Sequence, residues 1–192
     1  MQAVIASRLD SLPPDHKAIL LDAAVVGEVF WDGAVTELGD REHDAVEAAL
    51  RDLVGRSLVR HVRESTMAGE SEFAFAHALA RDVAYGALPR RIRAERHART
   101  AAWLEAKAGE RLEDVSDLLA HHRVTALDLA RAVGDADLAE RARGPAVTAL
   151  MRAGERAMRL DVEAAERLFA RAAELSTDGD AMRADLLQAW GR

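Results

Sequence analysis

Two short extended runs, set in a chain otherwise patterned for helices, constrain the fold most strongly. Residues 58–63 and 72–75 are rich in apolar side chains, and a polar tip containing Gly69 separates them. Such a pair indicates a β-hairpin. Elsewhere apolar residues recur at the spacing of amphipathic helices, and aromatic residues make up only 4% of the chain. The sequence therefore predicts a mainly α protein with one small β-hairpin.

Three short helices are expected between the double proline and the hairpin. The residue before a proline avoids the helical region, so a first helix ends at residue 12, and Asp15 is expected to cap the next. Residues 30–32 are expected to introduce a short helix through residue 38. Asp40 or Asp44 is expected to cap a third helix, whose apolar face would be formed by Val46, Ala49, Leu50, Leu53 and Val54. Three helices followed by a hairpin predict a winged helix.

Helices are also expected after the hairpin. The pattern predicts helices over residues 77–88 and 90–108, separated by Pro89, and helix pairs from Pro145 onward. Residues 149–175 partly fit a tetratricopeptide (TPR) unit, in which small residues let paired helices approach. Three residues stand at the expected small, aromatic and small positions: Ala165, Phe169 and Ala172. Residues 182–190 look like the first helix of a further repeat.

Composition excludes several classes of function. The chain has no cysteine, which rules out disulfides, thiolate metal sites and cysteine nucleophiles. It has no stretch long and apolar enough for a membrane span and no secretion signal, so we expect a cytoplasmic protein without membrane contact. The net charge of -7 opposes non-specific attraction to nucleic acid, unless positive charge is locally concentrated.

Several segments in one order carry a family resemblance. They are residues 3–13 (AVIASRLDSLP), 23–27 (AAVVG) with Phe30 and Trp31, 75–85 (FAHALARDVAY), His97 and 118–122 (LLAHH). Together they resemble the stretch that follows the ATPase core in bacterial STAND-type signal-transduction ATPases. The likeness is greatest to proteins that join a class III adenylate or guanylate cyclase domain to an AAA-like ATPase and TPRs, and LuxR-type transcriptional regulators are close relatives.

The resemblance implies a regulatory part of a larger protein. The expected organisation is the end of an ATPase lid helix at 1–12, a winged helix at 13–88, a linking helical region at 89–134 and truncated TPR-like repeats at 135–192. The parent would bind ATP or ADP with Mg²⁺ through a phosphate-binding loop. Neither Lys17 nor Lys107 has the Gly-rich context of such a loop, so we expect no cofactor and no catalysis in this chain.

His77 is the candidate nucleotide-sensing residue. In related switch ATPases, a histidine of the winged helix contacts the β-phosphate of ADP and holds the off state, and by resemblance His77 stands at that position. Ala76 and Ala78 depart from the flanking Met and Asp of the eukaryotic relatives. The alternative is a hydrogen-bonded structural histidine. Arg81 shares a helical face with His77 and is a second candidate, although an internal ion pair is the favoured interpretation; Tyr85 is expected to pack with its hydroxyl bonded.

Two other clusters are weaker candidates. Residues 90–99 carry five arginines against one glutamate, but no aromatic side chains interleave them for base stacking, and the candidate recognition helix at 44–54 is acidic. A solvated face, or docking to an acidic neighbouring domain, is therefore favoured over nucleic-acid binding. His121 and His122 diverge on a helix, and Asp117 with His121 lacks a third ligand, so no metal site is expected.

The function expected is a non-catalytic module that couples the nucleotide state of an ATPase to partner or ligand binding by helical repeats. Its expected partners are the neighbouring ATPase domain of the same chain and a protein or small ligand for the repeats. One alternative is a DNA-binding winged-helix regulator. Another is a plain TPR-type protein-interaction scaffold. No Ser-His pair or paired carboxylates that would indicate an enzyme can be identified.

Overall fold

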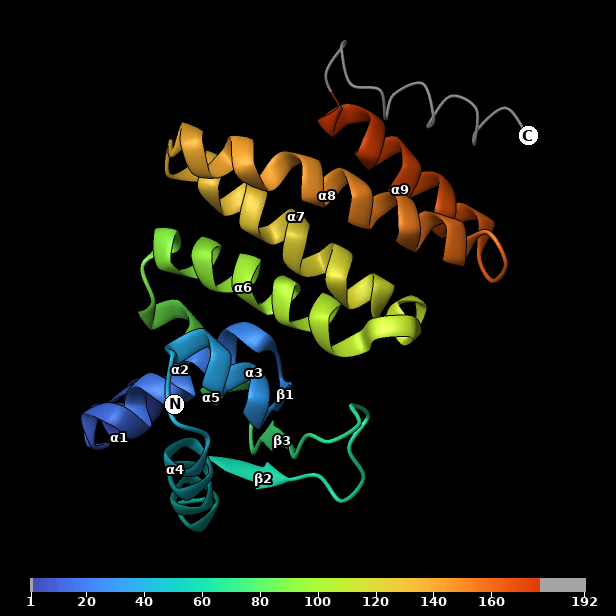
Figure 1. Ribbon diagram of the computed structural model, residues 1–192. Helices are drawn as coiled ribbons and strands as arrows, with labels where there is room; N and C mark the ends of the chain where they lie inside the picture. The colour runs from blue at the N-terminus through green and yellow to red at the C-terminus, as the bar shows by residue number, and fades with distance from the viewer. Residues whose placement is uncertain (1, 177–192) are drawn as a thin grey trace. The chain divides into compact units, whose positions relative to one another are not determined.

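A computed structural model describes residues 2–176 and divides the chain into two compact units. The first unit ends at Trp103 and the second begins at Leu104, so their boundary falls inside a long helix, α6, which spans Arg90–Ala108. That division lies within the predicted linking region 89–134. The chain is mainly helical with one small antiparallel sheet, as predicted (Figure 1).

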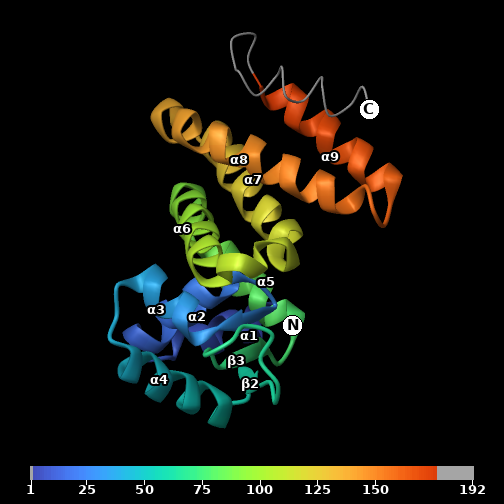
Figure 2. The same cartoon turned by 45° about the vertical axis from the view of Figure 1, so that its right-hand side comes forward.

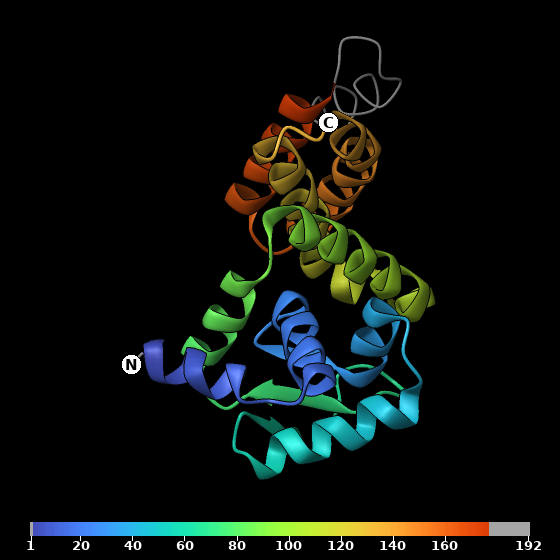
Figure 3. The same cartoon turned by 90° about the vertical axis from the view of Figure 1, so that its left-hand side faces the viewer.

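Helices make up most of the first unit. Besides the start of α6 they are α1 (Gln2–Asp10), α2 (Pro14–Val26), α3 (Asp32–Gly39), α4 (His43–Gly55) and α5 (Ala78–Ala87). Pro14 occupies the first position of α2, where the missing N–H is harmless. At the end of α2, the backbone N–H of Gly27 donates to the carbonyl oxygen of Ala23 at 3.1 Å. α1 packs beside α5, as Figure 3 shows at its left.

The predicted helix caps are wrong. Pro13 precedes α2 without a side-chain cap, and Asp15 lies in the first turn of the helix instead. Asp40 adopts a left-handed conformation, with φ of 50°, at the end of α3. Glu42 precedes α4 without a side-chain hydrogen bond, and Asp44 lies inside that helix. An Asp in a first turn interacts favourably with the helix dipole, so the acidic signal marked each helix start but not its capping residue.

The sheet has three strands, not two. The predicted hairpin is present as β2 (Val59–His61) and β3 (Glu72–Phe75), but β1 (Val29–Trp31) pairs with the other side of β3, giving the order β1-β3-β2. Residues 30 and 31 were predicted only to introduce a helix, and α3 does begin immediately after them.

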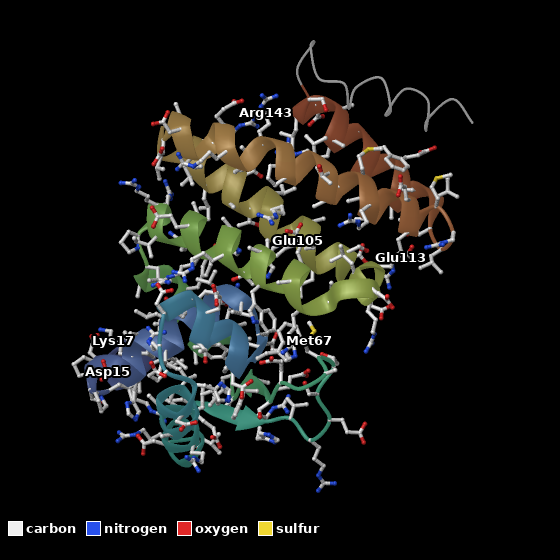
Figure 4. The ribbon with its side chains drawn as sticks, in the orientation of Figure 1. Asp15, Lys17, Met67, Glu105, Glu113 and Arg143 are labelled. Atoms are coloured by element: carbon white, nitrogen blue, oxygen red, sulfur yellow. The ribbon has the colours of Figure 1, made fainter. Side chains whose placement is uncertain are left out.

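The core of the first unit fills the space between this sheet and the helices. The Phe30 ring lies 5.9 Å from that of Phe73 and 5.6 Å from that of Phe75. On α4 the predicted apolar face is buried at Val46, Ala49, Leu50 and Leu53, whereas its last member, Val54, is exposed. The loop between β2 and β3 turns at Gly69, with φ of 77°, and also buries Met67, which is labelled in Figure 4.

The described part of the second unit is helical. After the last turn of α6 it comprises a 3-10 helix, η1 (Gly109–Val115), then α7 (Ser116–Ala132), α8 (Ala136–Ala157) and α9 (Val162–Leu175). α8 packs on both α7 and α9, and the three are drawn in yellow to red in Figure 2. Asp135 and Asp161 cap α8 and α9, each accepting a backbone N–H at 3.0 Å.

Small residues set the contact between α8 and α9. Ala165 and Ala172 are buried, as is Phe169. A β-carbon at Gly154 would lie 2.5 Å from Cε1 of Phe169, so only glycine fits opposite this ring in the present packing. α8 begins at Ala136, well before the predicted start at Pro145, which lies inside the helix on its exposed side. The segment 182–190, predicted to begin another repeat, lies outside the described residues.

Within residues 2–176, no helix has both the length and the apolar character needed to cross a membrane.

Candidate functional site

His77 is the last residue before α5 and has an extended backbone. Its side chain is exposed, and it makes no hydrogen bond or ion pair with any residue in the described range 2–176. The backbone alone fixes its place, because the His77 carbonyl oxygen accepts the N–H of Ala80 at 2.9 Å. The imidazole therefore faces solvent at the amino-terminal end of a helix.

Arg81 lies one helical turn further on and is held by its own unit. Its Nε donates to the carbonyl oxygen of Ala24 in α2 at 2.9 Å, which ties α5 to α2. Its Nη1 lies 3.4 Å from Oδ1 of Asp82, a mostly exposed carboxylate. This ion pair agrees with the favoured interpretation of Arg81. The guanidinium carbon of Arg81 also lies 4.7 Å from the ring centroid of Tyr85.

Tyr85 joins α5 to α6. Its hydroxyl lies 2.9 Å from Nε2 of His97, a buried histidine of α6, so the predicted packing role with a bonded hydroxyl is confirmed. A second guanidinium approaches the same ring, because Cζ of Arg93 lies 4.8 Å from its centroid. A cation over the face of an aromatic ring is attracted by the ring quadrupole. We name Arg81, Tyr85 and Arg93 the arginine–tyrosine cluster.

The other arginines of residues 90–99 mostly bind acids of the same unit. Arg96 Nε lies 3.0 Å from Oδ1 of Asp22, a buried carboxylate that also binds Arg41 at 2.7 Å. Arg99 Nη2 lies 2.6 Å from Oδ1 of Asp40. Arg91 pairs with Glu95 at 3.3 Å on the helix surface. The expectation of a solvated face is therefore wrong for Arg96 and Arg99, because their charges bind carboxylates of α2 and of the end of α3.

The Asp40–Arg99 pair is the clearest perturbation of an ionisable group. The hydrogen bond from Arg99 holds the pKa of the Asp40 carboxyl below its usual value, and the charges of Arg99, Arg96 and Arg41 act in the same direction. Asp40 in turn raises the pKa of Arg99. Both effects stabilise charged forms that already dominate at neutral pH, so the pair is a structural tie and not a proton donor or acceptor.

The exposed side of α4 carries acidic side chains. Asp44 and Asp52 are exposed and Glu47 is half-buried. Asp52 binds Arg56 at 2.7 Å and His16 at 3.2 Å, and Glu47 lies 3.9 Å from Arg51. These pairs reduce the negative charge but leave no cationic face of the kind that contacts DNA phosphates.

A shallow cleft of about 520 Å³ opens between α2 and α4. Ile19, Ala45 and Ala49 form much of its apolar wall, and Asp15, labelled in Figure 4, also lines it, together with Arg41. Arg41 is already bound to Asp22 there. The cleft offers an alanine-lined surface together with charged side chains of both signs, Asp15, Glu42 and Arg41.

The histidines of α7 point in different directions. His121 is exposed and His122 is buried, and their rings meet edge to face with centroids 5.3 Å apart. Asp117 binds Arg156 of α8 at 2.8 Å. Among the residues that the structure describes, no group of three or more His, Asp or Glu side chains could hold a metal ion.

Ion pairs also connect the helices of the second unit. Glu105, labelled in Figure 4, binds Arg123 of α7, and Glu113 binds Arg159 at 2.8 Å beyond the end of α8. Arg171 of α9 lies 3.0 Å from Asp128 of α7. These pairs lie on or near the surface, where each contributes little alone. They nonetheless neutralise several charged side chains that could otherwise bind a partner molecule.

Comparisons of the chain with protein-family models, with curated proteins and with solved structures found no match.

Sequence reasoning missed Arg93 as part of the site around α5. It was counted in the basic run 90–99, and its approach to Tyr85 depends on how the chain turns at Pro89 between α5 and α6. The signal that was available is the four-residue spacing of Arg81 and Tyr85, which places an arginine beside an aromatic ring on one helix. No local pattern places a residue of the next helix over that ring.

Proposed function

We propose that this chain is a non-catalytic regulatory module of a larger ATP-dependent signalling protein of the STAND type, either linked to an adenylate cyclase or acting in transcription. The first unit acts as a winged helix that senses nucleotide state. The second acts as the start of a TPR-like array that binds a protein or a small ligand.

The topology of the first unit supports the winged-helix assignment. α2, β1, α3, α4, β2 and β3 follow one another, and the sheet order is β1-β3-β2. A winged helix has this alternation of three helices with a small antiparallel sheet, in which the last two strands form the wing. The additional strand β1 fits such a domain better than the two-stranded hairpin expected from the sequence.

The packing of α8 against α9 supports the repeat assignment in part. Gly154 and Phe169 meet as a small residue and a large one, and Ala165 and Ala172 permit close approach. α8 departs from the pattern, because it is 22 residues long and contains Pro145. The α8–α9 contact is therefore the feature that supports the repeat assignment.

The exposed His77 is the observation that carries the sensing role. The side chains one and two turns further along α5 are bound within the unit, whereas the His77 imidazole has no partner within residues 2–176. A residue whose partner belongs to another domain is expected to be free in this way. One imidazole supplies a single contact, so ATP or ADP with Mg²⁺ would be held by the ATPase core of the parent.

The test uses the longer protein that includes its ATPase core. His77→Ala is expected to weaken ADP binding about tenfold, the loss that follows from one hydrogen bond to a charged group. His61→Ala, which removes an exposed histidine of β2 in the same unit, serves as the matched control. Unchanged ADP affinity in the His77 variant would favour a plain interaction scaffold instead.

Two further outcomes count against the proposal. ATPase or cyclase turnover by the purified 192-residue chain would contradict its non-catalytic role. A shift of duplex DNA by this chain that weakens as salt rises would favour the DNA-binding regulator, since salt dependence marks phosphate contacts.

A further inference from the structure

Two positive charges share one aromatic ring in the first unit. The guanidinium carbons of Arg81 and Arg93 lie 4.7 Å and 4.8 Å from the ring centroid of Tyr85. Arg81 comes from α5 and Arg93 from α6, so the turn at Pro89 brings together two cations from different helices. Each guanidinium is attracted by the ring, and an anion beside either of them would add a direct charge interaction to that attraction.

Protein groups compensate this charge only in part. Asp82 is the carboxylate at the cluster, and it lies 3.4 Å from Arg81 with 62% of its side chain exposed. Among the described residues no acid pairs with Arg93, and its Nε is buried without a hydrogen-bond partner. The remaining polar neighbour, His97, binds the Tyr85 hydroxyl. A buried donor without an acceptor costs about 1–3 kcal/mol, so this place favours an incoming acceptor.

The chemistry of the two arginines selects the kind of anion. A guanidinium presents its donors as a planar fork that binds two oxygens of a carboxylate or a phosphate. Arg81 already donates from Nε to the Ala24 carbonyl and from Nη1 to Asp82, so an anion here must bring oxygens for the Arg93 fork and for Nη2 of Arg81. A phosphoryl group offers at least three oxygens and about two negative charges at neutral pH.

We infer that the arginine–tyrosine cluster is a binding site for a phosphoryl group. Arg93 is its principal donor, Arg81 its second, and Tyr85 orients both side chains. The site itself stands on the contacts above. The source of the group rests on the proposed function, in which a nucleoside diphosphate would supply it, while free pyrophosphate has the same chemistry.

The test uses the chain itself and its single tyrosine. With Tyr labelled by ¹³C, the ring gives one set of NMR signals, and inorganic pyrophosphate is expected to shift them in a saturable way. Arg93→Gln should weaken binding about tenfold or more, and Arg93→Lys by less, because it keeps the charge but loses the fork. Arg90→Gln removes an exposed charge from the same helix and should bind as the unchanged chain does.

Several results would overturn the inference. An equal shift with acetate or with chloride at matched ionic strength would show a general anion effect. Equal weakening by the Arg90 and Arg93 variants would show net charge alone. If Arg93→Gln fails to fold, the order of affinities between the unchanged chain and Arg93→Lys decides, and equal affinities contradict the site.

The source of the phosphoryl group is read from a parallel titration with ADP. Binding as tight as that of pyrophosphate assigns the site to a nucleotide, and binding of pyrophosphate alone assigns it to free phosphates. The proposed function fails by a different result, an unchanged ADP affinity of the longer protein with His77→Ala. The two failures therefore fall on different residues and different proteins.

Discussion

Three carboxylates are buried in the first unit, those of Asp22, Asp32 and Glu72, whereas the buried polar side chains in the described part of the second unit are Ser116 and His122. In the first unit each carboxylate binds groups far away in the sequence. Asp22 binds Arg41 and Arg96, and Oε2 of Glu72 accepts from the Trp31 indole and from Thr66.

The second unit depends on contacts between successive helices. α8 packs on α7 before it and on α9 after it, and Gly154 against Phe169 sets one of these contacts. Nearest-neighbour packing of this kind tolerates change in number and length of helices, while distant polar links specify one arrangement. The comparison therefore separates a unit specified by buried charge from a unit specified by side-chain size.

The largest effect is expected from Asp22→Ala. The change leaves Arg41 and Arg96 without their shared carboxylate, and breaking a buried ion pair costs about 3 kcal/mol or more. Chemical denaturation measures the loss, and hydrogen exchange should place it in the first unit with α8 and α9 protected as before. Asp15→Ala, an exposed acid on the same helix, is the control and should cost well under half as much.

Glu72→Gln is expected to cost about 2 kcal/mol. One oxygen of Glu72 accepts from Trp31 Nε1 at 3.0 Å, from the Thr66 backbone N–H at 2.7 Å and from its hydroxyl at 2.6 Å. A neutral amide accepts these bonds more weakly. The unfolding free energy provides the measure, with exposed Glu64→Gln in the neighbouring loop as control. Equal losses of unfolding free energy in the two variants would show that the buried charge of Glu72 does not stabilise the first unit more than an exposed charge does.

Gly154→Ala tests the second unit by size alone. The added methyl group meets the Phe169 ring, and overpacking costs about 1–3 kcal/mol, partly offset by the better helix propensity of Ala. We expect a net loss of about 1 kcal/mol. Gly144→Ala on the same helix meets open space and should instead stabilise by up to about 1 kcal/mol. The midpoint temperature of thermal unfolding measures both effects. A shift in the same direction for Gly154→Ala and Gly144→Ala would contradict the role of close packing at Gly154.

The smallest effect is expected at Asp40, where the tie to Arg99 is exposed. The pKa of Asp40 is lower in the folded protein than its usual value of 3.8. Its contribution to stability is therefore fully present above pH 3.8 and is lost as the pH falls through the lower, folded-state pKa. The unfolding free energy of Asp40→Asn should therefore be slightly lower than that of the unchanged chain at pH 7, and the two values should converge in acid. Urea unfolding at several pH values measures this difference in unfolding free energy. A difference that grows as the pH falls would contradict the lowered pKa of Asp40.

The sequence anticipated the elements whose signal is local. The stripe on α4, the hairpin around Gly69 and the break at Pro89 all follow from spacing or from proline and glycine chemistry. β1 was missed because a three-residue strand has no period to detect, and its partner β3 lies far along the chain. The Pro145 interpretation failed because an exposed proline can lie inside a long helix that is stabilised by its packing.

The candidate site divides in the same way. Arg81 and Tyr85 are four residues apart on one helix, so their contact could be foreseen. The contact of Arg93 with Tyr85, and that of Arg96 with Asp22, depend on how α6 lies against α5 and α2 within the first unit. Composition counted these arginines as one basic run, but tertiary packing gives each a different partner.

Tyr85 is the only phenol in the chain, and it stands in the arginine–tyrosine cluster with its hydroxyl bonded to His97. Reagents that nitrate or iodinate tyrosine therefore have a single target, and the extent of modification measures how often that ring becomes accessible. An occupant of the cluster should slow the reaction. Peptide mass spectrometry could then follow occupancy of this one place in a crude mixture, without a purified ligand or an assay of activity.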